Sequence, residues 1–379
     1  MKIEQKLWSL KKGWTSVHQH SLKDKAQLVL AFGSREALSH SDRFFELKSF
    51  YPHAHILCSS TSGEILGGKV LDETIVATAL YFEKTVLKVA HTEISSMKDS
   101  YEKGVFLSKE LQQEDLVHVF VLSDGHVVNG SELVKGLNDA SDKPIPITGG
   151  LAGDGSLFQK TLVGVNEPAS EGKIVAIGFY GKNLKIGHGS KGGWDSFGPE
   201  RTVTRSESNI LYELDNQSAL ELYKKYLGSL ADELPGSALL FPLSIKLPGS
   251  NEVLVRTVLS IDEQNQSMIF AGDVPQGSQV QLMKANFDRL IDGAISAADS
   301  CLSALGSFTP DVAILISCVG RKLVLSHRIE EEIEEAKRIL GDTTVVTGFY
   351  SYGEISPVIE AAKCELHNQT MTITAYRED

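Results

Sequence analysis

The segment that decides the fold class is DVAILISCVGR (311–321), with the charged stretch EEEIEEAKRIL (330–340) and then TTVVTGFYSYGEI (343–355) after it. The first and last runs are apolar almost throughout, which is typical of strands buried on both faces, and the stretch between them is helical in character. A strand, a helix and a second strand in this order form one βαβ unit. The segment therefore predicts an α/β fold.

Two further segments have the same shape. One joins LVLAFGS (28–34) to HAHILCSSTSGEI (53–65), and the other joins VHVFVLSDG (117–125) to IPITGGLAGDG (145–155), each through a helical stretch. The first and third units also share the letters Ser-x-Gly-Glu-Ile, with one residue fewer at Ser62–Ile65 than at Ser351–Ile355. Internal duplication explains this likeness, and chance similarity of short βαβ units is the alternative.

Between these units the pattern changes to alternating strands with tight turns, at 161–189 and again at 237–274, which predicts antiparallel meanders. A helix is expected over 219–234, after a turn at Asp215-Asn216 and before Pro235-Gly236. We therefore expect an α/β (mixed α+β) protein whose two domains have mixed sheets. The expected divisions are an N-terminal extension (1–24), a first domain (25–215) and a second domain (216–379).

Composition excludes several classes of protein. The 379 residues are 42% hydrophobic and 23% charged, and 37 basic against 49 acidic residues give a net charge of -12 with no segregated basic patch, which argues against nucleic-acid binding. No C-x-x-C pair occurs among Cys58, Cys301, Cys318 and Cys364, so a reducing cytoplasm is expected. No apolar run approaches the roughly 18 residues that span a bilayer, and no secretory signal begins the chain, which predicts a soluble cytoplasmic protein.

Glycines and carboxylates follow the predicted strands. Gly149, Gly150 and Asp154 belong to a glycine-rich stretch that, as a strand-end loop, would let backbone N–H groups approach a ligand; a plain turn is the alternative. Each of the pairs Gly63-Glu64 and Gly353-Glu354 places a carboxylate at a strand end, where ligands of open sheets collect. Two such carboxylates in one cleft could perform acid–base chemistry or bind a cation, and solvated side chains are the alternative.

The third unit offers further candidates. Tyr350 and Tyr352 are two apart, so on one strand they would form an aromatic wall, although packing explains them as well. Arg321 follows a buried strand and could bind a carboxylate bidentately, with an ion pair to an acid at 330–335 as the alternative. Cys318 would need a neighbouring base to act as a nucleophile, and a buried structural thiol is favoured.

Two histidines are candidate axial ligands of haem. His188 lies between two glycines that leave room for a flat ligand, and His367 precedes Asn368 and Gln369, which could orient its ring. The pairs His18/His20 and His53/His55 would share a metal if they lay on strands. Structural roles are the alternative throughout. None of the usual hydrolase or zinc-protease motifs occurs, so catalysis is not indicated.

Several separated motifs in order resemble the FIST family. In the second half these are Phe241–Leu243, Gly272–Ser278, Ser317–Arg321, Gly348–Ile355 and Cys364–Thr370; in the first half they are Cys58–Glu64 and Thr148–Asp154. The resemblance covers about residues 25–370.

This resemblance implies a non-enzymatic bacterial sensor that binds a small ligand and regulates a separate signalling partner. Some stand-alone members are haem proteins that sense nitric oxide and act on a histidine kinase or a cyclic-di-GMP enzyme in two-component signalling. This haem-based function is the more specific expectation, and a homo-oligomer is compatible with it.

Two alternatives stay open. One is a sensor of an amino-acid-like polar ligand, and the other is an enzyme that uses Glu64, Glu354 or Cys318. In either sensor, the strand-end loops are expected to converge on one ligand cleft. The expected ligand-binding residues are Gly63, Glu64, Gly149, Gly150, Asp154, Cys318, Arg321, Tyr350, Tyr352 and Glu354.

Overall fold

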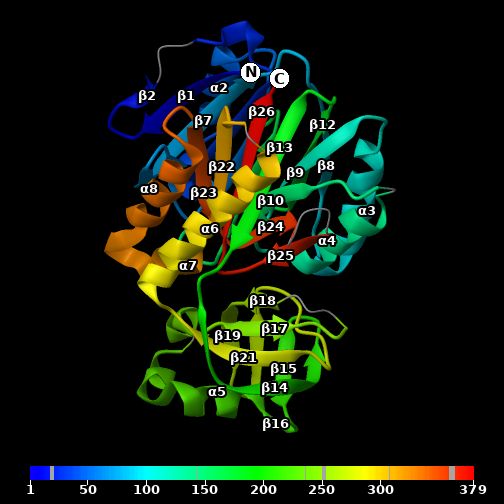
Figure 1. The fold of residues 1–379 in the computed structure, drawn as a ribbon, viewed down its shortest axis with the longest axis vertical. Helices are drawn as coiled ribbons and strands as arrows, with labels where there is room; N and C mark the ends of the chain where they lie inside the picture. The colour runs from blue at the N-terminus through cyan, green and yellow to red at the C-terminus, as the bar shows by residue number, and fades with distance from the viewer. Residues whose placement is uncertain (18–20, 142, 235, 250–252, 307, 358–362) are drawn as a thin grey trace.

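The larger body of the molecule consists of three repeats that share one strand order (Figure 1). This computed structural model describes residues 1–17, 21–141, 143–234, 236–249, 253–306, 308–357 and 363–379. Repeat 1 covers residues 2–81, repeat 2 covers 86–180, and repeat 3 combines 184–191 with 287–378. In each repeat a pair of parallel strands is extended by two further strands, each antiparallel to the strand before it, so the expected α/β class with mixed sheets is confirmed.

Four strands of each repeat follow one another across its sheet in the same order. Those of repeat 1 are β4 (His55–Thr61), β3 (Leu28–Ser34), β7 (Thr74–Tyr81) and β1 (Lys2–Ser9), with β2 (Gly13–Ser16) beyond them. Those of repeat 2 are β10 (Ile147–Leu151), β9 (Leu116–Ser123), β12 (Lys173–Tyr180) and β8 (Val86–Glu93). Those of repeat 3 are β23 (Val345–Ser351), β22 (Val312–Cys318), β26 (Met371–Glu378) and β13 (Leu184–Lys191).

Helices cover the outside of the sheets (Figure 1). They are α1 (Arg35–Ser39) and α2 (Asp42–Phe50) in repeat 1, α3 (Ser100–Leu111) and α4 (Gly130–Asp139) in repeat 2, and α6 (Phe287–Leu305), α7 (Val319–Leu325) and α8 (Ile329–Leu340) in repeat 3. Each of the three predicted strand–helix–strand units is a parallel strand pair joined by helix, as expected.

The repeats are linked in a ring because each one adds a short strand to its neighbour. The strand β11 (Val163–Val165) of repeat 2 pairs with β4 of repeat 1, and β5 (Glu64–Leu66) of repeat 1 pairs with β23 of repeat 3. The strand β24 (Gly353–Pro357) of repeat 3 pairs with β10 of repeat 2 and closes the ring. Two outer strands, β6 (Lys69–Leu71) and β25 (Cys364–His367), extend these additions.

Backbone hydrogen bonds repeat the same cyclic order at the carboxyl ends of the parallel strands. The N–H of Ser62 donates to the Tyr350 carbonyl over 2.8 Å, that of Gly153 to Ser60 over 3.0 Å, and that of Tyr352 to Leu151 over 3.2 Å. The inner faces of all three sheets meet in one apolar core, to which the repeats contribute residues such as Phe32, Phe120 and Phe349. The three repeats therefore fold as one body around a pseudo-threefold axis.

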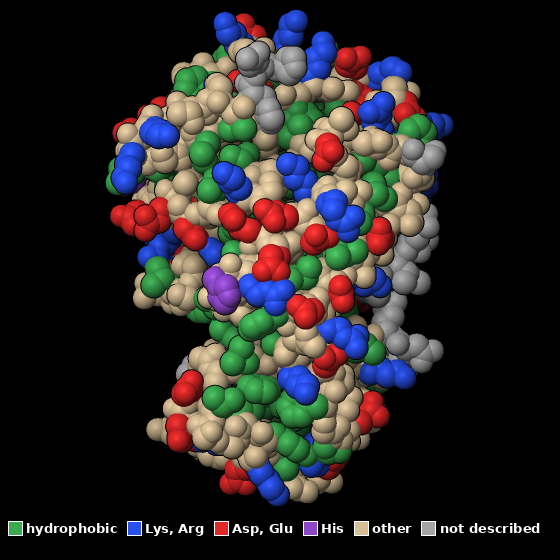
Figure 2. Space-filling model, turned by 60° about the vertical axis from the view of Figure 1, so that its left-hand side comes forward, with side chains coloured by type: hydrophobic (Ala, Val, Ile, Leu, Met, Phe, Trp, Pro, Cys, Tyr) green, Lys and Arg blue, Asp and Glu red, His purple; other side chains and the backbone are tan. Residues whose placement is uncertain are grey.

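A smaller lobe, residues 195–284, is inserted between the first strand and the first helix of repeat 3 (Figure 1, lower part). Its elements are β14 (Asp195–Glu207), β15 (Ile210–Leu214), β16 (Gln217–Ser218), α5 (Ala219–Leu227), β17 (Leu243–Lys246), β18 (Val253–Arg256), β19 (Val258–Asp262), β20 (Ser267–Phe270) and β21 (Gln279–Lys284). The lobe has its own apolar core, and Figure 2 shows a narrow waist between it and the larger body.

One expectation about this lobe differs from the structure. The helix expected over 219–234 ends at Leu227, because Gly228 has a φ of +59° and a 3-10 turn follows; Pro235 lies outside the described residues. Residues 215 and 216, where the two expected domains meet, form the turn between β15 and β16. Strands from both sides of that position pair in two of the six-stranded sheets.

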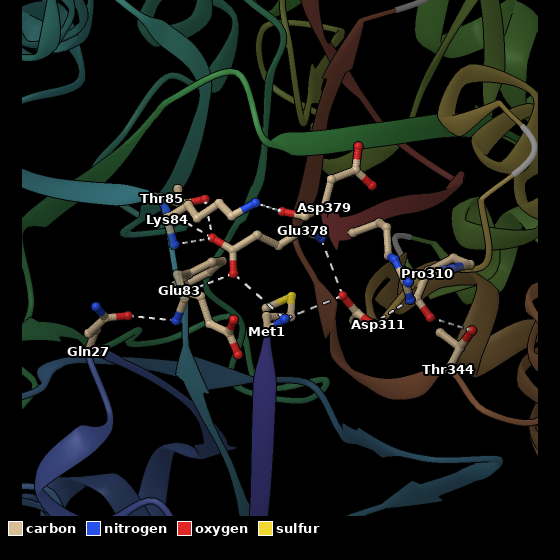
Figure 3. A network of polar contacts seen from close by, with 12 residues as sticks. Met1, Gln27, Glu83, Lys84, Thr85, Pro310, Asp311, Thr344, Glu378 and Asp379 are labelled. Atoms are coloured by element: carbon tan, nitrogen blue, oxygen red, sulfur yellow. Dashed lines mark hydrogen bonds and ion pairs between the residues drawn. The ribbon is translucent and has the colours of Figure 1, made fainter.

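The opposite end of the body is held together by a buried carboxylate, that of Glu378 (Figure 3). It accepts hydrogen bonds from the backbone N–H groups of residues 83–85 and from the Thr85 hydroxyl, and the amino terminus of Met1 lies 3.6 Å away. Burial alone would raise the pKa of Glu378, but these hydrogen bonds outweigh it and lower that pKa.

Within the described ranges, no helix is long and apolar enough to cross a membrane.

Candidate functional site

One carboxyl group occupies the same place in each repeat, three residues beyond the end of the second parallel strand. Thr61 pairs with Ser34, Leu151 with Ser123 and Ser351 with Cys318, so Glu64, Asp154 and Glu354 are equivalent. Glu64 is the first residue of β5 and Glu354 the second residue of β24, and Gly153-Asp154 is the third member of the set.

In repeats 1 and 3 this carboxyl group is enclosed by hydroxyl groups of its own repeat. Glu64 accepts from the hydroxyls of Thr61 and Thr74, both over 2.6 Å, and Glu354 accepts from those of Ser351 over 2.6 Å and Thr370 over 3.0 Å. Burial raises the pKa of Glu64 to about 7 and that of Glu354 to about 8, although these hydrogen bonds oppose the shift. Both groups are hydrogen-bonded within their own repeats.

The raised pKa of Glu354 predicts a pH-dependent stability. Its ordinary pKa is 4.5, so the folded state retains the proton between that value and about 8. The stability that this group contributes is fully present below pH 4.5 and is lost as the pH rises through about 8. We expect the free energy of unfolding of wild type, relative to that of Glu354→Gln, to fall between pH 5 and pH 9. Urea titrations across this range measure it, and a constant difference would contradict it.

Repeat 2 departs from this pattern. Leu151 and Ile174 stand where repeat 1 has Thr61 and Thr74, so Asp154 lacks the two hydroxyl partners. Its Oδ2 instead accepts from Arg35 over 2.8 Å and from the backbone N–H groups of residues 159 and 160, while Oδ1 accepts from the Tyr352 hydroxyl. Burial would raise the pKa of Asp154, but the hydrogen bonds and Arg35 outweigh it and lower that pKa.

Asp154 and Arg35 lie in a cleft of about 810 Å³ between repeats 1 and 2. Repeat 1 supplies the ends of β3 and β4, the start of α1, and residues before β7, while repeat 2 supplies the loop after Asp154. The lining residues are Trp8, Leu10, Ser34, Arg35, Glu36, Ala37, His40, Arg43, Thr61, Ser62, Gly63, Glu64, Asp72, Glu73, Asp154, Gly155, Ser156 and Leu157. Five of them are acidic and two are arginines, so the cleft is suited to charged polar molecules.

Charged groups in the cleft can bind both signs of charge. The Arg35 side chain is 27% exposed and lies over the fully buried Asp154 carboxylate, so one face of its guanidinium can meet a ligand. Arg43 lies 4.7 Å from the Trp8 ring, and its buried Nε has no hydrogen-bond partner within the described residues. From repeat 3, Lys322 donates to the Ser62 carbonyl over 2.8 Å and pairs with Asp72, and both of these partners line the cleft.

Several expected ligand residues lie away from this cleft. Arg321 is fully buried and pairs with Glu332 over 2.7 Å, and the Tyr350 hydroxyl donates to the other oxygen of Glu332 over 2.9 Å. Arg321 therefore pairs with an acid from 330–335, and this pair is buried. The Arg321 side chain is not open to a ligand. Burial raises the pKa of the Cys318 thiol, with the Glu354 carboxyl adding to the shift, so the thiol stays protonated.

The two tyrosines do not form one wall. Tyr350 packs in the core beneath α6 and α8, whereas Tyr352 packs in that of repeat 2 and stacks on Phe158 at 4.7 Å. The glycine-rich stretch does not form the expected strand-end loop at Gly149 and Gly150. These two residues lie inside β10, with a paired strand on each side. Their backbone groups are occupied by the sheet, and only Gly63, Glu64 and Asp154 of the expected ligand residues line the cleft.

The surroundings of the two candidate haem ligands do not fit haem. A Cβ on Gly187 or Gly189 would meet carbonyls of α6 at 2.2 Å and 2.1 Å, so the glycines beside His188 accommodate a helix. His367 is 6% exposed, its Nε2 lies 3.0 Å from the Ser356 carbonyl, and burial lowers its pKa to about 4. Neither histidine lines the cleft.

The expectation that His18/His20 or His53/His55 share a metal finds no support from the described residues. No group of three or more candidate metal ligands occurs among them, and His18 and His20 lie outside them. His55 lies 3.1 Å from Asn166, and burial followed by the charge of Lys48 lowers its pKa.

Sequence reasoning missed most of the cleft. Arg35 directly follows a predicted strand, which is the same signal that selected Arg321, but it was assigned to a helical stretch. Asp72 and Glu73 belong to a turn that the sequence alone does not bring near Asp154. The three Gly-carboxylate pairs were all visible, and alignment of the three units on them would have marked Asp154 as the member that differs.

Comparisons with known proteins agree with the expected family. The model of the FIST N domain matches residues 27–217 and that of the FIST C domain matches residues 219–357. Uncharacterized protein MJ1623 of Methanocaldococcus jannaschii is 24% identical over 333 residues, which are 77% of this chain and 59% of that protein. The chain thus spans about 59% of the length of this relative.

Among solved structures, a chorismatase crystal structure aligns with 99% of this chain and 98% of its own, at 9% identity and a TM-score of 0.34. A similarity this low supports no inference about activity.

Proposed function

Because this chain belongs to the FIST family, whose domains are sensory domains of signal transduction, we propose that it senses a small charged polar molecule in the cleft between repeats 1 and 2. Ligand binding there changes the state that a signalling partner reads. The ligand carries a cationic group, which the cleft carboxylates bind, and an anionic group, which Arg35 binds. An amino-acid-like molecule has both groups.

One observation carries this proposal. Of three equivalent carboxyl groups, Glu64 and Glu354 accept from hydroxyls of their own repeats and have raised pKa values, whereas Asp154 has a lowered pKa and pairs in the cleft with an arginine of the neighbouring repeat. The partner of that carboxylate, Arg35, comes from the neighbouring repeat, and its side chain is 27% exposed in the cleft, where it can meet a ligand. A binding role accounts for the exception in repeat 2. The haem function has no comparable support from His188 or His367.

The test is a thermal-shift screen of small zwitterions, amines and dicarboxylates against wild type, Arg35→Gln and Asp154→Asn. We expect a compound that stabilises wild type to bind each variant about 10- to 100-fold more weakly, because a charged hydrogen bond contributes about 1.5–3 kcal/mol. Calorimetric titration of that compound measures the affinities.

Glu354→Gln is the matched control. It changes the equivalent carboxyl of repeat 3, which does not line the cleft, and its affinity is expected to equal that of wild type. Unchanged binding by both cleft variants, or equal weakening by Glu354→Gln, would contradict the proposal.

A further inference from the structure

Repeat 2 contains a second cavity, of about 400 Å³, where α3 and α4 end and β9 and β10 begin. The cleft between repeats 1 and 2 lies at the carboxyl ends of parallel strands, so this cavity is at the opposite end of its sheet. Nothing in the proposed function involves it. Its volume is within the range of small-molecule sites, roughly 300–1,000 Å³.

The floor of the cavity is apolar. Val119, Leu137 and Ile147 are buried members of the core beneath α3 and α4, and the partly buried Leu116 and Ile145 pack against them. Such a floor removes the apolar part of a ligand from water, which is the main source of affinity for small organic molecules.

The rim of the cavity is negative. Glu114 and Asp115 line it and form no ion pair within the described part of the chain, and Lys143 is the one basic residue among those that line it. Gln112, the C-cap of α3, and Ser141, two residues beyond the end of α4, also line the rim, and helix carboxyl ends carry partial negative charge. Two carboxylates and two helix ends therefore face one lysine.

We propose that this cavity binds a small organic cation, an amine whose aromatic or branched alkyl body lies on the apolar floor and whose ammonium group meets the Glu114 and Asp115 carboxylates. An apolar acid of the same size lacks this match, because its carboxylate would meet two carboxylates and have Lys143 alone as partner. The cavity therefore selects by charge at the rim and by size at the floor.

The test is calorimetric titration of the full chain with 2-phenylethylammonium and, separately, with 3-phenylpropionate at low ionic strength. These probes have similar bodies and opposite charges. We expect saturable binding of the amine with one site, and binding of the acid at least tenfold weaker. Absence of saturable amine binding, or equal binding of the acid, would overturn the proposal.

Two variants locate the binding. Leu137→Phe fills the floor, and Ser108→Trp covers the rim from a half-buried position on α3. We expect each to lower the affinity for the amine at least tenfold, whereas Glu354→Gln, which lines neither the cavity nor the cleft, leaves it unchanged. If Leu137→Phe does not melt cooperatively, Ser108→Trp decides alone. Unchanged affinity in Ser108→Trp assigns the amine elsewhere and overturns the proposal.

Discussion

Arg321→Met is expected to lower the free energy of unfolding by about 3–5 kcal/mol, because it leaves the buried carboxylate of Glu332 without its cation. Both side chains of this pair are fully buried. Arg321 also donates to the carbonyl of Leu290 over 2.7 Å and to that of Gly192, so these acceptors lose a partner as well. Chemical denaturation of the purified variant measures the loss.

Arg338→Met provides the matched control. Arg338 pairs with Glu335 over 2.8 Å on α8, the helix that also carries Glu332. The Arg338 side chain is 63% exposed. An exposed pair contributes about 0–1 kcal/mol, so this variant is expected to stay close to wild type. If Arg321→Met were no more destabilising than Arg338→Met, the assignment of Arg321 to a structural role would be contradicted.

Gly149→Ala is expected to lower the free energy of unfolding by at least about 3 kcal/mol, because backbone strain and overpacking add at this position. Gly149 has a φ of +151°, and a Cβ built on it would lie 1.9 Å from the carbonyl oxygen of Val121. The neighbouring strand therefore has no room for even a methyl group. Denaturant titration measures the loss.

The control for this variant is Gly13→Ala. Gly13 has a φ of +62°, and nothing lies within 4 Å of a Cβ built on it, so only the backbone strain remains. That strain costs roughly 1 kcal/mol. Equal losses in the two variants would contradict the close approach of β10 to β9 at Gly149.

The repeated units were predictable from sequence, but the ring was not. The apolar runs around Val29, Val119 and Ile314 predicted three strand–helix–strand units because burial on both faces leaves a continuous apolar pattern. The exchanged strands β5 and β11 have only three residues each, and β5 pairs with residues about 280 positions away. Such short strands have no sequence signal of their own, so their pairing depends on the packing of the whole body.

The site was also predictable only in part. Strand-end carboxylates identified Glu64, Asp154 and Glu354, but their hydroxyl partners, such as Thr74 and Thr370, come from other strands. Whether a carboxyl is enclosed or open to a ligand therefore depends on tertiary contacts. Glu332 shows the same limit: it belongs to the run of acids 330–335, which reads as a solvated helix face, yet it is fully buried against Arg321.

The most direct test of the proposed cleft is hydrogen exchange of the wild-type backbone, measured by mass spectrometry with and without the compound that stabilises the protein most in the screen. We predict slower exchange in residues 34–43, 61–73 and 154–160, which surround Arg35 and Asp154. Segments 318–321 and 350–354, and those that contain His188 and His367, are expected to exchange as before. Protection confined to these latter segments would contradict ligand binding in the cleft.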